Sequence, residues 1–271
     1  MNNEKRIRQV LSLTFTGSHL LSRYDQLVRF RKGQLSATRL LASLALDLAL
    51  GVAVAHVVTA QSQTPPALLT RQVLHAMETV ISRLRQLITW LMGAPAGLKL
   101  NSVLATALGK FFLYHIHLWV TFLYLSAPLV SENLLGARHL FALSYVGFGL
   151  QVSVAQDTLN LITFHVQCFY AYARRLFVSQ TSGLTSLWRL FRGKKYNPLR
   201  DRVDSSSYTV DQLFVGTLAF TILLFLYPTT LTYFAVFKVL EMTINGANWA
   251  LSSIASLSIN AFDESVEVYK W

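Results

Sequence analysis

The sequence predicts an all-α, polytopic helical membrane protein with about four to six membrane segments plus an interfacial amphipathic helix. Hydrophobic residues make up 53% of the chain, and its mean hydropathy is +0.41. Charged residues make up only 14%, against roughly 25% in an average soluble domain. The third observation is that long apolar stretches recur along the chain. A disulfide-bonded scaffold is excluded, because Cys168 is the single cysteine.

The first 39 residues form a basic segment. They hold eight Lys and Arg residues, and their apolar residues are interrupted throughout by polar ones. Cytosolic parts of membrane proteins collect Lys and Arg. We therefore expect residues 1–39 to be a basic cytosolic N-terminal segment.

Residues 40–240 are predicted to form a helical membrane domain. They contain four long apolar stretches, at residues 40–58, 111–130, 140–178 and 213–240. A helix crosses the hydrocarbon core with about 20 residues, so we interpret the first two stretches as single spans. We expect the fourth to bend or turn at Pro228, because proline removes a backbone donor. Residues 241–271 follow as a C-terminal apolar segment with a short tail.

The third stretch, residues 140–178, crosses the membrane either once or twice. It is followed by a second basic segment, the loop 179–212, which we expect to be cytosolic like the N-terminal segment. An even number of crossings must then separate the two basic segments. Either the third stretch crosses twice, as a short hairpin, or one of the stretches does not cross at all. We favour the hairpin or a re-entrant pair, with a break near Gly147, Gly149 and residues 151–157.

Residues 67–90 are predicted to form an amphipathic helix after the Pro65-Pro66 break. Apolar residues recur there every three or four positions, and most arginines lie off their stripe. The stripe consists of Leu69, Val73, Met77, Val80, Leu84, Leu87 and Leu91. Such a helix either lies in the plane of the headgroups or packs on a neighbouring subunit.

Basic and aromatic side chains alternate within the loop 179–212. Trp188 and Tyr196 accompany six cations between residues 189 and 202. Tryptophan and tyrosine favour the membrane interface, and cations favour anionic headgroups. Because spans lie on both sides, we interpret the loop as a surface for membrane lipid or a cytosolic partner, with no nucleic acid bound. The candidate contacts are Arg192, Lys194, Lys195 and Arg200.

A stripe of polar residues runs through the third apolar stretch. At about 100° per residue its members share one arc of a helix, roughly 120° wide. They are Ser153, Gln156, Asp157, Asn160, Thr163 and Gln167. The stripe indicates either helix–helix hydrogen bonding, which we favour, or a lipid-headgroup or catalytic cleft. Gln156, Asp157, Asn160 and Gln167 are therefore candidate partner or lipid contacts.

No catalytic, metal or cofactor site is predicted. His115 and His117 project about 200° apart on a helix and cannot share a metal ion, so we keep His115 only as a candidate partner contact. The chain lacks a phosphate-binding loop, a dinucleotide fingerprint, an Asp-x-Asp pair, a His-Glu-x-x-His pair and a Gly-x-Ser-x-Gly elbow.

Several segments of the sequence resemble the PIG-Q family. Residues 91–101 (LMGAPAGLKLN) are similar to its signature, and residues 111–119 (FFLYHIHLW) and 161–170 (LITFHVQCFY) to the blocks that follow. The strongest similarity runs from 186 to 205, through 211–218 (DQLFVGTL), to 226–230 (LYPTT). These segments occur in the same order as in the family, and the similarity covers about residues 40 to 240.

The resemblance implies a multi-pass protein of the endoplasmic reticulum membrane. It implies a non-catalytic subunit that organises or stabilises the complex transferring N-acetylglucosamine from UDP-GlcNAc to phosphatidylinositol, the first step of GPI-anchor biosynthesis. The implied glycosyltransferase is PIG-A, and the other implied partners are PIG-C, PIG-H, PIG-P, PIG-Y and the small DPM2 subunit.

Two other functions compete with this one. The first is a membrane enzyme that acts directly on a lipid through Asp157 and His165. The second, which we rank last, is a transporter, which would need matching broken helices in two halves. Pro228 has no counterpart in the first half of the chain.

Overall fold

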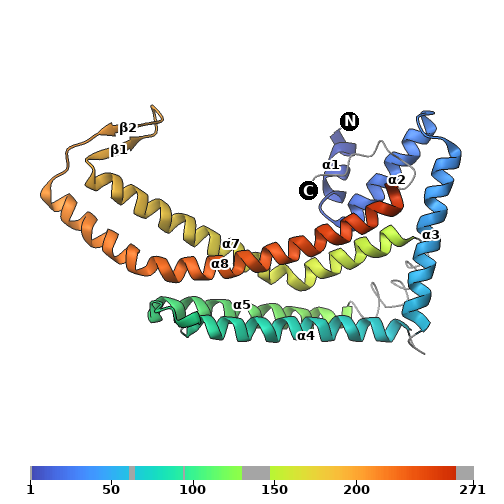
Figure 1. The fold of residues 1–271 in the computed structure, drawn as a ribbon, viewed down its shortest axis with the longest axis horizontal. Coiled ribbons are helices and arrows are strands. Elements are labelled where there is room, and N and C mark those ends of the chain that lie inside the picture. The colour runs from blue at the N-terminus through green and yellow to red at the C-terminus, as the bar shows by residue number, and fades with distance from the viewer. Residues whose placement is uncertain (1, 61–64, 94, 130–146, 261–271) are drawn as a thin grey trace. The chain divides into compact units, whose positions relative to one another are not determined.

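The computed structural model describes residues 2–60, 65–93, 95–129 and 147–260, and most of them are helical (Figure 1). The elements are α1 (Asn2–Leu11), α2 (Phe15–Arg31), α3 (Ala37–Ala60), α4 (Pro65–Met92), a 3-10 turn (Pro95–Gly97), α5 (Ser102–Leu129), α7 (Phe148–Phe191), β1 (Lys194–Asn197), β2 (Arg202–Ser205) and α8 (Val210–Asn260). The predicted all-α class is confirmed. The antiparallel β1–β2 hairpin in the basic loop was not predicted.

The chain divides into two compact units, which we describe separately. The first falls within Met1–Val80, Val120–Phe164 and Thr243–Trp271, and the second within Ile81–Trp119 and His165–Met242. Helices α4, α5, α7 and α8 each contribute one part to each unit.

Three described helices are long and apolar enough to cross a membrane. The candidate spans are Ala37–Val57, Ser102–Leu125 and Val210–Ser256. They overlap the first, second and fourth apolar stretches of the sequence. Helix α7, which holds most of the third stretch, does not meet the same criterion of apolar composition.

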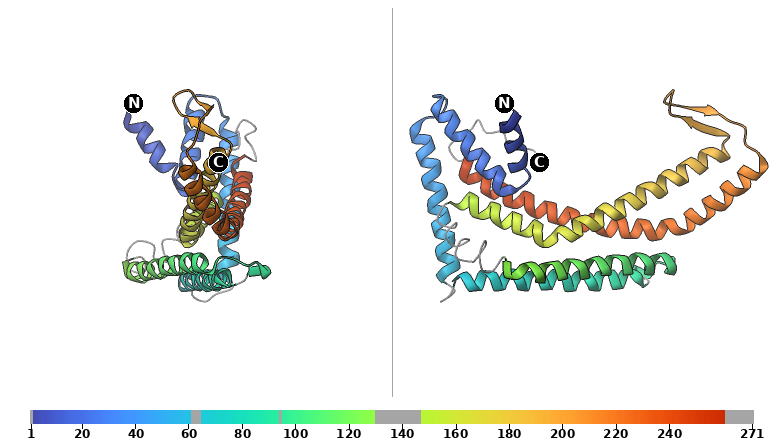
Figure 2. Two further views of the ribbon diagram at one scale, coloured as in Figure 1. Left: turned by 90° about the vertical axis from the view of Figure 1, so that its left-hand side faces the viewer. Right: turned by 180° about the vertical axis from the view of Figure 1, so that it is seen from behind.

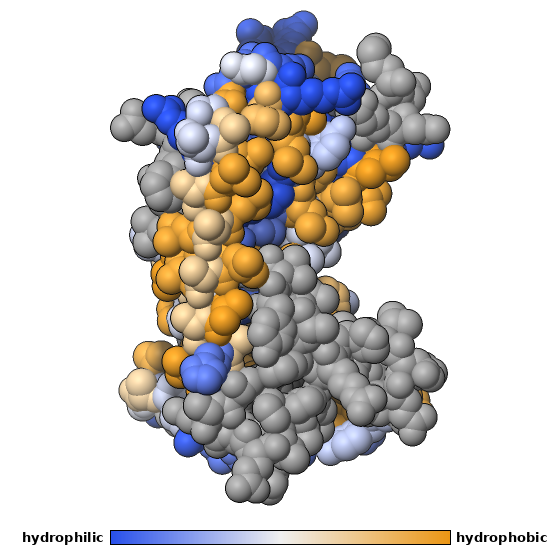
Figure 3. Space-filling view, turned by 90° about the vertical axis from the view of Figure 1, so that its right-hand side faces the viewer, coloured by the Kyte–Doolittle hydropathy of each residue, from blue (hydrophilic) through white to orange (hydrophobic). Residues whose placement is uncertain are grey.

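Helix α3 has the opposite polarity to a helix of a soluble protein. Its buried positions, spaced three or four residues apart, include Ser43, Asp47 and Gly51. Its exposed positions are mainly leucine and valine, and apolar side chains line it in the space-filling view (Figure 3). This arrangement suits a membrane span, in which lipid contacts the apolar face and the protein covers the polar one.

A break within residues 151–157 is wrong, whereas the chain does leave the helical conformation at Gly147, whose φ is 152°. Helix α7 begins at Phe148, directly after Gly147, and continues through residues 151–157 without interruption. The polar side chains there bond to other helices or back to their own preceding turn, so they do not open the helix. Gln151 Nε2, for example, donates to the carbonyl of Gly51 on α3 at 2.8 Å. Residues 140–146 of the stretch lie outside the described residues.

A turn at Pro228 is also wrong, because α8 is one helix from Val210 to Asn260. Proline leaves the carbonyl four residues earlier without its helical donor. That carbonyl belongs to Leu224, and the carbonyl of its neighbour Leu223 accepts a hydrogen bond from Nε2 of the buried Gln180 of α7 at 2.9 Å. Donors from neighbouring helices commonly allow proline inside membrane helices.

The core of the second unit is aromatic. Phe112 of α5, Phe169 of α7 and Phe237 of α8 are almost fully buried, and their ring centroids lie 4.8 to 5.7 Å apart. Tyr233 adds a buried hydroxyl, which donates to the carbonyl of Ala105 at 3.0 Å. In this unit α7 and α8 run side by side to the hairpin that joins them (Figures 1 and 2).

The predicted amphipathic helix is present as α4. In the second unit its buried residues are Ile81, Leu84, Ile88 and Leu91. Leu84 and Leu91 belong to the predicted stripe, and Met92 at its end packs against Gly109 of α5. The stripe therefore packs at least partly within the chain. A position in the headgroup plane stays a prediction.

Candidate functional site

A buried ion pair joins α2 to the candidate span α3 in the first unit. Nη2 of Arg23 lies 2.8 Å from Oδ2 of Asp47, and the two side chains are 14% and 6% exposed. The other oxygen of Asp47 accepts the backbone N–H of Gly149 at the start of α7, at 2.8 Å. A carboxylate at this depth in an apolar helix needs such partners. Asp47 thus connects three helices.

His19 packs beside this ion pair. It lies one helical turn before Arg23, it is buried, and its imidazole lies so close to Gly149 that a side chain there would collide with it. Burial, together with the nearby Arg23 charge, lowers the pKa of His19 to about 4, and the Asp47 charge partly opposes this shift. The imidazole is therefore neutral at pH 7.

Asp157 caps the start of α2. Its two carboxylate oxygens accept the backbone N–H groups of Phe15 and Thr16, at 2.8 and 2.9 Å. The hydroxyl of Thr14 accepts the N–H of Gly17 at 3.0 Å. The first three amides of a helix lack partners within the helix, and its N-terminus favours negative charge. Asp157 therefore supports the fold of α2.

Two further members of the predicted stripe, Gln156 and Asn160, face the last part of α8. Nε2 of Gln156, which is 2% exposed, donates to the carbonyl of Asn248 and to the hydroxyl of Ser252, both at 2.8 Å. Nδ2 of Asn248 donates in turn to Oδ1 of Asn160 at 2.7 Å. These bonds hold α7 and α8 together within the first unit.

The structure thus brings together Gln156, Asp157 and Asn160, but not Gln167, which lies half-buried in the second unit. The geometry agrees with helix–helix hydrogen bonding, the interpretation we favoured. A contact of these residues with a partner or a lipid remains a prediction.

The two histidines considered for chemistry lie among aromatic rings of the second unit. His115 is half-buried, and its Nδ1 lies 2.8 Å from the carbonyl of Phe111. His165 is buried, with ring centroids of Trp119 and Phe169 at 6.2 and 6.0 Å. In the described part of the chain no three His, Cys, Asp or Glu residues are grouped so that they would hold a metal ion.

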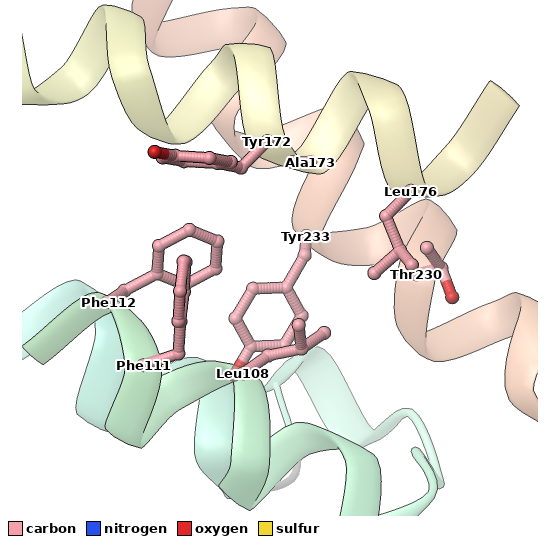
Figure 4. A pocket seen from close by; sticks show the side chains of 8 residues that line it. All are labelled: Leu108, Phe111, Phe112, Tyr172, Ala173, Leu176, Thr230 and Tyr233. Atoms are coloured by element: carbon pink, nitrogen blue, oxygen red, sulfur yellow. The ribbon is translucent and has the colours of Figure 1, made fainter. Parts of the chain in front are cut away.

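An apolar pocket of about 210 Å³ lies between α5, α7 and α8 in the second unit (Figure 4). It is lined by Leu108, Phe111, Phe112, Tyr172, Ala173, Leu176, Thr230 and Tyr233. Aromatic rings face one another across it in the close-up, and its wall offers almost no polar surface. The pocket suits a hydrocarbon group and has no charged group for acid–base chemistry.

The four basic candidate contacts lie on or next to the β1–β2 hairpin. Arg192, Lys194, Lys195 and Arg200 are all exposed. The strands pair Lys194 with Ser205 at one end and Asn197 with Arg202 at the other. The prediction that these cations lie on the surface is confirmed. Their distribution over the two faces of a hairpin was not predicted.

Sequence reasoning missed the group formed by His19, Arg23 and Asp47. One signal for it existed: Asp47 is the single acidic residue of the first apolar stretch. Its partner lies 24 positions upstream on another helix, where nothing in the spacing distinguishes Arg23 from the other cations of the basic segment.

Comparison with known proteins gives one family and several relatives. The model of the N-acetylglucosaminyl transferase component (Gpi1) matches residues 3–263. The phosphatidylinositol N-acetylglucosaminyltransferase subunit Q of Homo sapiens is 47% identical over 203 residues, which cover 75% of this chain and 26% of the human protein. Subunit Q of Mus musculus is 45% identical over 205 residues, covering 76% and 34%.

A yeast protein is also similar. The N-acetylglucosaminyl-phosphatidylinositol biosynthetic protein gpi1 of Schizosaccharomyces pombe is 34% identical over 168 residues, which cover 62% of this chain and 25% of the yeast protein. No solved structure matches the chain. The chain spans about a quarter to a third of the length of the mammalian relatives.

Proposed function

Because this chain belongs to the family of the N-acetylglucosaminyl transferase component (Gpi1), we propose that it is a non-catalytic membrane subunit of that transferase complex. The complex transfers N-acetylglucosamine from UDP-GlcNAc to phosphatidylinositol, the first step of GPI-anchor biosynthesis. The chain organises or stabilises the complex, and a different subunit carries out the transfer.

The observation that carries this proposal is the role of Asp157. A general base for the attacking hydroxyl of the lipid would need a carboxylate that reaches the substrate. Both oxygens of Asp157 instead accept the first two amides of α2. Asp47, which is buried in the same unit, is engaged with Arg23 and Gly149. These carboxylates support a structural role.

The exposed surfaces of the spans support a role in assembly. Helix α3 presents Leu41, Leu48 and Val57 outward, and α8 presents Phe214 and Phe225. Large apolar surfaces on membrane helices contact either lipid or other subunits. The chain therefore offers helix faces on which further membrane subunits pack.

The partners and the location follow from the family. We propose that the chain assembles in the endoplasmic reticulum membrane with the catalytic subunit PIG-A and with PIG-C, PIG-H, PIG-P, PIG-Y and DPM2. The basic loop and the cations of the N-terminal basic segment, apart from the buried Arg23, then face the cytosol, because Lys and Arg accumulate on that side.

Affinity purification tests this proposal. The tagged chain is purified in mild detergent, its partners are identified by mass spectrometry, and transfer from UDP-GlcNAc to phosphatidylinositol is assayed before and after the partners are stripped by salt and stronger detergent. We expect the transferase subunits to co-purify and the stripped chain to be inactive until they are added back. Transfer by the stripped chain alone would contradict the proposal and favour direct lipid chemistry.

A further inference from the structure

The β1–β2 hairpin lies at one end of a membrane span. Only residues 206–209 separate β2 from α8. No Asp, Glu, Lys or Arg occurs from Leu213 to Phe237, a run longer than the roughly 20 residues of one crossing. The hairpin therefore stands next to the lipid surface at which α8 enters the membrane.

The two faces of the hairpin differ in how their charges are paired. Side chains alternate between the faces of a strand, so the register places Lys195, Asn197, Arg202 and Asp204 on one face. On this face Asp204 accepts hydrogen bonds from Nε of Arg202 at 2.7 Å and from Nδ2 of Asn197 at 3.0 Å. Lys195 stands directly opposite the same carboxylate. The single carboxylate of this face therefore compensates one of its two positive charges.

The other face combines a cation with aromatic and aliphatic side chains. It carries Lys194, Tyr196 and Val203, and the last two are each 45% exposed. The guanidinium of Arg189, at the end of α7, lies 5.8 Å from the centre of the Tyr196 ring. This composition is typical of protein surfaces that contact the membrane interface.

The tip of the hairpin exposes an apolar side chain beside a cation. Leu199 is 95% exposed, and Arg200 follows it. The acid of the tip, Asp201, accepts the hydroxyl of Tyr196, and Asn197 holds the turn by accepting the N–H of Leu199 at 3.1 Å. A fully exposed leucine is unfavourable in water but gains free energy when it inserts among lipids.

We propose that this hairpin docks onto anionic phospholipid headgroups, with Lys194 and Arg200 contacting phosphates and Leu199 entering the interface. Charge complementarity supports this occupant, because among the described residues neither cation takes part in an ion pair. An acidic protein surface would satisfy the cations but would leave no reason for an exposed leucine at the tip. The proposal is independent of the function of the transferase complex.

A spin label on the hairpin tests the proposal in the full-length chain. Pro198 is replaced by Cys in a Cys168→Ser background, labelled with a nitroxide, and reconstituted in nanodiscs of phosphatidylcholine with or without 30 mol% phosphatidylserine. The ratio of immobilised to mobile label measures docking. Two double variants are compared, Lys194→Gln with Arg200→Gln and Lys195→Gln with Arg202→Gln, which remove the same charge from different faces. Leu199→Ser tests the apolar contact.

We expect phosphatidylserine to raise the ratio of immobilised to mobile label at low salt, and 0.5 M salt to reverse this increase. Lys194→Gln with Arg200→Gln should lower the ratio about tenfold or more, since each cation near an anionic surface contributes roughly a fivefold factor. The matched pair should change it less than about twofold, and Leu199→Ser should lower it severalfold. Equal loss in both double variants, equal docking in pure phosphatidylcholine, or docking that requires another protein would each overturn the proposal. Circular dichroism checks that all variants keep the helical fold.

Discussion

Arg23 and Asp47 form an ion pair of 2.8 Å that couples the basic N-terminal segment to the middle of a candidate membrane span. The pair links two parts of the chain that the sequence assigns to different environments, the cytosol and the membrane. Because Asp47 also accepts the N–H of Gly149, the pair positions the start of α7 as well. We therefore regard it as the main polar contact between these three helices.

Removing the carboxylate of this ion pair should destabilise the folded chain. Asp47→Leu leaves the Arg23 guanidinium buried without its carboxylate, and we expect it to lower the stability of the chain by about 3–5 kcal/mol. Thermal unfolding in detergent measures the loss. Asp25→Leu is the matched control, because Asp25 pairs with Arg8 on the exposed side of α2 and should change stability by only about 0–1 kcal/mol.

A double variant then separates charge from packing. Arg23→Met together with Asp47→Leu removes both charges and should recover part of the stability lost in Asp47→Leu alone, since apolar replacements of a buried pair are often neutral. A double variant that is as unstable as the sum of the two single variants would show that the pair does not interact in the folded chain.

The lowered pKa of His19 should make the stability of the chain depend on pH. Its pKa is about 4 in the folded chain and 6.5 in its ordinary state, so the unfolded chain binds more protons between these values. Stability should therefore be complete above pH 6.5 and fall as the pH drops toward 4, by about 2 kcal/mol at pH 5. The measurement is the unfolding temperature against pH, compared with His19→Gln, which should lack this component. Identical pH profiles for the two proteins would show that His19 titrates normally.

Gly149 and His19 should show strong energetic coupling. A methyl group on Gly149 would collide with the imidazole, so we expect Gly149→Ala to cost roughly 1–3 kcal/mol. In a His19→Ala background the same change should cost much less, which gives a coupling of about 1 kcal/mol or more in a double-mutant cycle. Additive effects would mean that the ring does not occupy this position.

The sequence predicted those features that depend on local spacing. A period near 3.6 placed Leu84 and Leu91 of α4 on one buried stripe, and the same period placed Gln156, Asp157 and Asn160 on one arc of α7. What this arc contacts was not predictable. Asn160 bonds to a residue 88 positions away, and Asp157 caps a helix 142 positions earlier, so neither contact leaves a mark in the local pattern.

The features that were missed depend on tertiary contacts or on very short elements. Pro228 remains inside α8, and Gln180 of a neighbouring helix donates to the carbonyl of Leu223, next to the carbonyl that the proline leaves without its helical donor. The strands of the hairpin have four residues each and are mostly exposed, so they show no alternation of apolar and polar residues. Only the turn residues Asn197 and Pro198 indicated that the chain reverses there.

The most direct measurement of the central claim is turnover per assembled complex in the variant Asp157→Leu. If Asp157 serves the fold, losing its two bonds to α2 should lower the yield of complex that co-purifies with the tagged chain, while each assembled complex keeps its rate of transfer from UDP-GlcNAc to phosphatidylinositol. Asp157→Asn, which keeps one acceptor oxygen, should assemble better than Asp157→Leu. A complex that assembles in normal yield but has lost turnover would contradict the account and make Asp157 a participant in the reaction.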